Sequence, residues 1–418
     1  MPESREMYDQ THEFRPTQPN ERIFAIDAVR GVAIFGILVV NMIYFAWPFH
    51  AEVVGIELWS STADLIAETA IRFFAEGKFI TMFSLLFGLG FSMLITRAEK
   101  RGARVAPLFV RRLLVLLLIG LVHTLFIWVH DVLVYFALTG FILLLFRNRE
   151  PRTLLRWAAL FLAVPIVVAI VLAALAAVAA ASPEAAAQME AGIAEQRAMF
   201  ERLYEQAFAT YSTGTFAEVT VQRLADFSLE FIGGFIGSNL FLIAAMFLLG
   251  TWFGRQAMFS DVEGNIDRWR RLFRTALPIG VIASLVYTWA SLAAEPLDLS
   301  WPFALRTAGM FIGGPALSLT YVAAIVLTSR REHVRRLLQP VANVGRFALS
   351  NYLLQSVICT TLFYGYGFGL MGRVGPAVGL AITVAIYALQ LLLSSLWVRR
   401  FRYGPAELLW RRLTYRAV

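Results

Sequence analysis

Long, predominantly apolar runs with few charges recur along this chain, each close to the roughly twenty residues that a helix needs to cross a bilayer. They fall at 26–48, 79–96, 108–129, 131–147, 156–181, 231–254, 275–294, 305–329, 346–368 and 374–398. Only 16% of the residues are charged, whereas a soluble protein averages about 25%. The sequence therefore predicts an all-α, polytopic membrane protein with about ten transmembrane helices.

Basic residues collect in alternate loops. Most of the 37 lysines and arginines lie before the first run, after the last, or in every second connection between runs. Basic loops of membrane proteins stay in the cytoplasm, so we expect a bacterial cytoplasmic (inner) membrane protein with both termini inside. The net charge of +8 is then a topological signal. It does not indicate nucleic-acid binding, which requires basic residues on one water-exposed face.

The runs and their charges divide the chain into three parts. Residues 1–22 are polar and lack the apolar core of a secretory signal, which predicts a disordered cytoplasmic tail. Residues 23–398 form a single transmembrane domain, with external helical loops at 49–75 and 182–226, and residues 399–418 form a basic cytoplasmic tail. The runs at 108–129 and 131–147 are short, so a re-entrant hairpin is an alternative to two full crossings.

Ionisable groups inside membrane spans are costly, which makes each of them a candidate functional residue. Asp27 and Arg30 lie three residues apart in the first span, so they can pair on one helix face. Either this is a structural ion pair, or Arg30 receives an anionic ligand from the cytoplasm. Asn41 lies further along the same span, towards the outside.

A second polar group is found in GLVHTLFIWVHDVLVYFALTG. His123 lies in the third span among apolar residues, and Asp131 follows eight residues later, across a turn that could bring the two together. A carboxylate that fixes the tautomer of a histidine is the usual arrangement of a general base. The alternative is a histidine that simply hydrogen-bonds to a neighbouring helix. The histidine spacing does not suggest a metal site.

Two further groups are weaker candidates. Lys78, at the outer mouth of the second span, could neutralise an acidic substrate, pair with Asp131, or extend to the membrane interface. Asn351 and Gln355 lie four residues apart in the ninth span, where amides either join helices or line a cavity.

Several segments resemble the YeiB-like bacterial inner-membrane proteins and together span most of the chain. These segments are IDAVRGVAIFGILVVN, GKFITMFSLLFGLGF, RRLLVLLLIGLVHTLFIWVHDVLVYFALTG, GRFALSNYLLQSVICTTLFY and FRYGPAELLWRRLT. The resemblance extends residue by residue to seven positions: Asp27, Arg30, Gly31, Asn41, Lys78, His123 and Asp131.

This family is grouped by similarity with membrane acyltransferases such as the lysosomal heparan glucosaminide acetyltransferase and the acyltransferase-3 proteins. Those enzymes use a histidine to move an acyl group from cytoplasmic acyl-CoA to an acceptor on the far side. The resemblance implies acyl-CoA as the donor near Arg30. His50 is roughly where the lysosomal enzymes carry their histidine, but the YeiB-like proteins are not expected to have one there, which favours His123.

Three functional hypotheses follow. The leading one is an acyltransferase in which His123, oriented by Asp131, acts on a small-molecule or glycan acceptor. Asp27, Arg30, Asn41, Lys78, Asn351 and Gln355 would bind the substrates. The rivals are a transporter of a small anionic metabolite and a non-catalytic scaffold. Partners would be membrane lipids and, as an open option, a second copy of the chain.

Overall fold

A computed structural model describes residues 23–56, 58–100 and 105–415, and all regular structure in this part of the chain is helical. The helices are α1 (Phe24–Ala46), α2 (His50–Val54), α3 (Thr62–Phe74), α4 (Lys78–Lys100), α5 (Val105–Phe126), α6 (Val132–Phe146), α7 (Pro151–Ala180), α8 (Pro183–Thr213), α9 (Phe216–Glu230), the π-helical segment η2 (Phe231–Asn239), α10 (Leu240–Arg255), α11 (Ile266–Ala293), α12 (Trp301–Thr328), α13 (Glu332–Arg346), α14 (Ala348–Phe363), α15 (Pro376–Trp397) and α16 (Pro405–Thr414).

Seven helical stretches in the described residues are long and apolar enough to cross a membrane, and the bent pair α9–α10 makes an eighth if it counts as one span. Helices α6 and α14 are apolar but shorter. Each of the ten runs in the sequence coincides with one of these helices. The all-α, polytopic fold class is confirmed, and the count of ten crossings remains a prediction.

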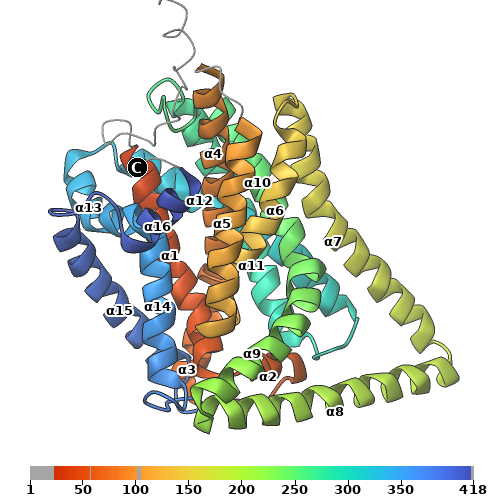
Figure 1. Cartoon of the computed structure of the whole chain (residues 1–418). Coiled ribbons are helices and arrows are strands. Elements are labelled where there is room, and N and C mark those ends of the chain that lie inside the picture. The colour runs from red at the N-terminus through yellow and green to blue at the C-terminus, as the bar shows by residue number, and fades with distance from the viewer. Residues whose placement is uncertain (1–22, 57, 101–104, 416–418) are drawn as a thin grey trace, which may run out of the picture.

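The arginine-rich connections gather at one end of the bundle, which we call the Arg-rich end. There Arg255 donates to the backbone carbonyls of Phe146, Arg147 and Arg149, and Arg330 is paired with Glu263. Helices α13 and α16 lie at the same end (Figure 1). Loops far apart in sequence are thus joined on one face, as the alternation of charge requires.

The segment after residue 398, for which the sequence predicts a tail, carries helix α16. The helix is docked on the bundle, because Trp410 donates from Nε1 to the carbonyl of Arg112 and Glu407 accepts the backbone N–H groups of Leu349 and Ser350 at the start of α14. Residues 1–22, predicted as a tail, lie outside the described residues.

Helix α1 crosses the bundle from the Arg-rich end to the opposite end (Figure 1). Its close packing against α13 depends on glycine. A methyl group at Gly31 would meet the carbonyl oxygen of Val341, and one at Gly345 would meet that of Asp27. Small residues at such crossings let two helix backbones approach closely where lipid provides no hydrophobic driving force.

Helices α2, α3 and α8 cover the opposite end, where α8 lies across the bundle (Figure 1). Ser61 caps α3 by accepting a hydrogen bond from the amide of Asp64, and Ser182 caps α8 by accepting one from the amide of Ala185. Thr215 and Glu218 form a capping box at the start of α9.

Candidate functional site

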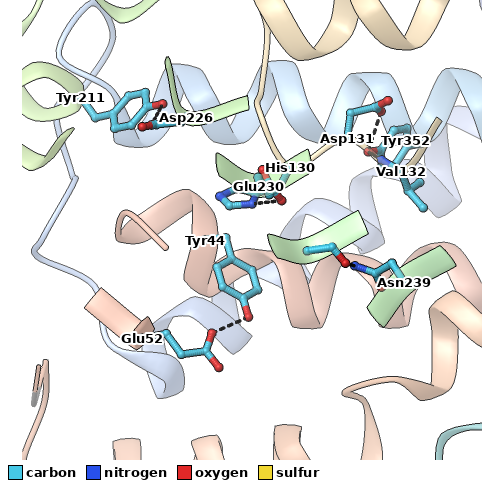
Figure 2. Close-up of polar contacts among 11 residues, drawn as sticks. Tyr44, Glu52, His130, Asp131, Val132, Tyr211, Asp226, Glu230, Asn239 and Tyr352 are labelled. Atoms are coloured by element: carbon cyan, nitrogen blue, oxygen red, sulfur yellow. Dashed lines mark hydrogen bonds and ion pairs between the residues drawn. The ribbon is translucent and has the colours of Figure 1, made fainter. Parts of the chain in front are cut away.

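His123 and Asp131 meet inside the bundle. Nδ1 of His123 lies 2.9 Å from Oδ1 of Asp131, and Oδ2 of the same carboxylate caps α6 by accepting the amide of Val134 at 2.8 Å. The hydroxyl of Tyr352 on α14 donates to Oδ1 at 3.2 Å (Figure 2). Both His123 and Asp131 are 1% exposed. The carboxylate is therefore fixed by three groups from three helices.

This geometry leaves one nitrogen of His123 unengaged. A carboxylate at Nδ1 favours the tautomer that carries its proton there, so Nε2 keeps its lone pair. In the part of the chain that the structure describes, Nε2 is buried and has no hydrogen-bond partner. His123 thus faces the protein interior and has the arrangement of a general base.

Two more histidine–carboxylate pairs lie nearby. Nδ1 of His130 is 2.6 Å from Oε1 of Glu230 at the end of α9 (Figure 2). Nε2 of His50 is 3.5 Å from Oδ1 of Asp226 on the same helix. Helix α9 thus presents two carboxylates to the histidines of α2 and of the α5–α6 turn. Among the described residues no group of three or more ligating side chains could hold a metal ion.

His50 lies in a wholly buried site outside the membrane-spanning helices. Burial lowers its pKa to about 4, and the nearby His130 contributes in the same direction. The nearby carboxylate of Asp226 also accepts hydrogen bonds from Tyr211 and Gln222. We therefore expect His50 to be neutral at physiological pH.

A cavity of about 320 Å³ leads from the Arg-rich end towards Asp131. Its charged wall is lined by Asp27, Arg30, Arg97, Arg112, Arg346, Glu407 and Arg411. Its deeper wall is apolar and includes Ile37, Phe83 and Leu116, and it also reaches Val132 and Tyr352. We call it the Arg cavity. His123 does not line it and stands behind Tyr352, with the two ring centroids 5.3 Å apart.

A second cavity, of about 590 Å³, lies at the opposite end between α1, α2, α3 and the start of α15. We call it the acidic cavity, because among the described residues Glu52, Glu68, Glu76 and Glu295 line it together with two arginines. Ile37 of α1 lines the Arg cavity, whereas Val39 lines the acidic cavity. Along α1, the lining of the Arg cavity therefore ends where that of the acidic cavity begins, and these two positions face different sides of the helix.

The structure also places the other predicted residues. Asp27 and Arg30 pair at 3.3 Å and line the Arg cavity. Lys78 does not pair with Asp131: it is buried at the first position of α4, and its Nζ donates to the carbonyl of Arg72 at 2.9 Å. Asn41 is half-buried and lines neither of the two cavities.

Asn351 and Gln355 join helices and line neither cavity. Gln355 donates to Oε1 of Gln390 on α15 at 2.8 Å, and Gln390 donates to the carbonyl of Asn351. The amide of Asn351 in turn reaches Ser394. This buried network pins α14 to α15, which is the helix-joining alternative from the sequence.

Sequence reasoning overlooked several residues of this region, among them Tyr352, Glu230, Asp226 and Tyr44. Tyr352 stands between the amides Asn351 and Gln355, but nothing in the sequence relates it to Asp131, 221 positions away. Asp226 is the last residue of the predicted external loop 182–226, and Glu230 lies between that loop and the apolar run at 231–254. Only the folding of α9 back against the bundle brings their carboxylates to the histidines.

Comparison with known proteins finds relatives over nearly the whole chain. The protein is 36% identical over 418 residues to the uncharacterised protein YxaH of Bacillus subtilis, covering 96% of each chain. It is 29% identical over 425 residues to the uncharacterised protein YeiB of Escherichia coli, covering 95% of this chain and 97% of the other. Residues 253–417 match the family described as a protein of unknown function, DUF418. No solved structure matches.

Proposed function

This chain belongs to the YeiB-like family of membrane proteins, and from its site we propose that it is a transmembrane acyltransferase of the bacterial inner membrane. The Arg-rich end faces the cytoplasm, in keeping with the positive-inside rule. Acyl-CoA enters there, and the acceptor approaches from the other end.

The Arg cavity is the observation that carries this proposal. Its mouth holds Arg30, Arg97 and Arg112, and its deeper wall is apolar. Guanidinium groups bind phosphates through charge-assisted hydrogen bonds, and an apolar channel excludes free anions from its interior. The combination fits a molecule with a phosphate-bearing head and a long, less polar arm, which describes acyl-CoA.

The length of the cavity supports the same ligand. Along α4, its lining runs from Arg97 to Phe83, which is roughly 20 Å at about 1.5 Å per residue. The pantetheine arm has about twelve bonds between its pyrophosphate and its sulfur, which span roughly 15 Å when extended. Phosphates held at the mouth would therefore bring the thioester near Tyr352, next to the His123–Asp131 pair.

The proposed reaction uses His123 as a general base once the side chain of Tyr352 moves aside. Nε2 accepts the proton of an acceptor hydroxyl or amine, whose heteroatom attacks the thioester carbonyl. The carbon–sulfur bond breaks, the acyl group stays on the acceptor, and the CoA thiolate leaves and takes up a proton. Asp131 stabilises the imidazolium that forms between these steps.

Binding of acetyl-CoA and longer acyl-CoAs to the purified full chain tests the proposal. Gly90 lines the Arg cavity, and an added Cβ there meets no atom within 4 Å. Gly90→Leu should therefore obstruct the channel without displacing backbone and should abolish binding. Gly192→Leu is the matched control, because Gly192 also faces open space but lies on α8. Absence of saturable acyl-CoA binding by folded wild-type protein would sink the proposal.

Transport of a small anion is the second candidate, and the two cavities on different faces of α1 favour it. In many transporters the substrate site lies near the middle of the membrane and is reached alternately from either end. Flux measured in liposomes separates the two functions. Transport continues without CoA and survives Asp131→Asn, whereas acyl transfer requires both acyl-CoA and the His123–Asp131 pair.

A further inference from the structure

The acidic cavity has an excess of negative charge in its wall. Four glutamates line it against Arg72 and Arg306, and Arg72 is already bound to Glu68 through Nε at 3.1 Å and Nη2 at 2.7 Å. Lys78 lies behind the wall, where its ammonium group donates to a backbone carbonyl. Even with Lys78 counted, carboxylates outnumber the cations.

Glu52, Glu76 and Glu295 form no ion pair among the described residues, and Glu52 and Glu76 share the electrostatic field of Arg72 with Glu68. Glu52 accepts a hydrogen bond from the hydroxyl of Tyr44 at 2.8 Å (Figure 2). Glu76 is hydrogen-bonded to the hydroxyl of Tyr287. Neutral hydroxyls satisfy the oxygen lone pairs but do not balance the charge, so a cation placed between the two carboxylates would be attracted to both.

Aromatic rings form other parts of the same wall. The rings of Tyr44, Trp47 and Trp59 line the cavity. The indole of Trp59 donates to Glu68 at 2.8 Å, and that of Trp47 donates to the carbonyl of Val374 at 2.9 Å. Rings held in this way lose little conformational freedom when a ligand binds, and aromatic faces attract ammonium groups.

A polar atom in the wall is also unsatisfied. Ser291 lines the cavity, and its Oγ, behind the accessible surface, has no hydrogen-bond partner in the described part of the chain. Buried hydroxyls are nearly always hydrogen-bonded, either within the protein or to a bound molecule. A volume of about 590 Å³ is within the usual range for small-molecule sites.

We infer that the acidic cavity binds a ligand bearing an ammonium group, held between Glu52 and Glu76 and against the aromatic wall. Tyr44 connects this site to the polar centre, because its ring centroid is 5.1 Å from that of His130, next to Asp131. Binding of this ligand does not depend on the proposed acyltransferase function. If the chain performs the proposed acyl transfer, the same ligand is the acceptor and its amine receives the acyl group, an assignment that rests on the proposed function.

The probes are 1,4-diaminobutane and 1,4-butanediol, which have the same length and differ in charge. Calorimetry on the purified full chain should detect the diamine and not the diol. Glu52→Gln and Glu76→Gln should each weaken diamine binding roughly tenfold or more. Glu190→Gln is the control, since this exposed glutamate on α8 changes the charge equally but lies outside the cavity. The thermal unfolding midpoint verifies that each variant is folded.

Equal binding of diamine and diol, no binding of either, or an equal loss in Glu190→Gln overturns the inference. Nanodiscs of phosphatidylglycerol with and without phosphatidylethanolamine identify the source of the ammonium group. If phosphatidylethanolamine competes with the diamine, the site binds a lipid headgroup. If it does not compete, the site binds a soluble amine. Acyl-CoA binding at the Arg cavity is measured separately, so failure of the proposed function and failure of this site are distinguishable.

Discussion

Nδ1 of His123 and Oδ1 of Asp131 lie 2.9 Å apart although eight residues separate them in the chain. The contact forms because Asp131 caps α6 while His123 projects from the last turn of α5, so the turn between the two helices places both side chains on its inner side. A capping carboxylate is thereby given a second partner, and the histidine acquires a fixed tautomer.

Asp131→Asn should separate catalysis from donor binding. The amide keeps the size of the side chain but no longer enforces the proton on Nδ1, so acyl transfer should fall by about 100-fold or more. Acyl-CoA affinity should stay within about twofold, because Asp131 does not line the Arg cavity. Steady-state kinetics and calorimetry measure the two quantities. Asp226→Asn is the comparison, and an equal loss of turnover there would argue against a special role for His123.

Donor binding should depend on salt through the arginines at the mouth of the Arg cavity. Arg30→Ala and Arg97→Ala should each weaken acyl-CoA binding by roughly tenfold at low ionic strength. The loss should shrink as added salt screens the remaining charges. Arg306→Ala at the opposite end should bind normally. Identical salt curves for all four proteins would show that phosphates are not bound at this mouth.

Gly345→Ala should destabilise the fold, because the new methyl group would meet the backbone carbonyl of Asp27 on α1. Overpacking of this kind typically costs about 1–3 kcal/mol. Gly192→Ala on α8 has open space around it and should gain up to about 1 kcal/mol from helix propensity. Thermal unfolding in detergent compares them, and equal midpoints would contradict the close α1–α13 contact.

Gln355→Leu should affect stability and leave binding unchanged. The substitution removes the donor to Gln390, whose amide oxygen is then buried without its partner. Such losses in membrane proteins cost about 0.5–2 kcal/mol. A lower unfolding midpoint with unaltered acyl-CoA affinity is the expected pair of results. A large loss of affinity would instead show that the amide contacts substrate.

Acidification should destabilise the protein through His50. Its pKa is about 4 when buried and 6.5 in the unfolded chain. Between these values the unfolded chain binds a proton that the folded chain does not, so stability falls as the pH drops from 6.5 to 4 and this loss is complete below pH 4. His50→Phe should have a shallower pH dependence of the unfolding midpoint over this window. Parallel curves for the two proteins would contradict the assignment.

Membrane periodicity and local pairs could be read from the sequence. The apolar runs and the Asp27–Arg30 pair depend on neighbours within a few residues, and the structure has both of them. The pairing of Asn351 and Gln355 with another helix was one of two alternatives. The pairing of Lys78 with Asp131 was one of three alternatives, and the structure has Lys78 bound to the carbonyl of Arg72 instead, a contact that sequence separation does not reveal.

The sequence by itself determined the helical membrane architecture, because the length of each apolar run and the charge of its flanking loops act locally on insertion into the membrane. Only the tertiary structure decided that Tyr352 meets Asp131, that α9 brings Glu230 and Asp226 to His130 and His50, and that two cavities approach α1 from opposite ends. These contacts join residues many positions apart. They depend on how helices pack around one another, and apolar periodicity specifies that a helix is buried but not which helix lies beside it.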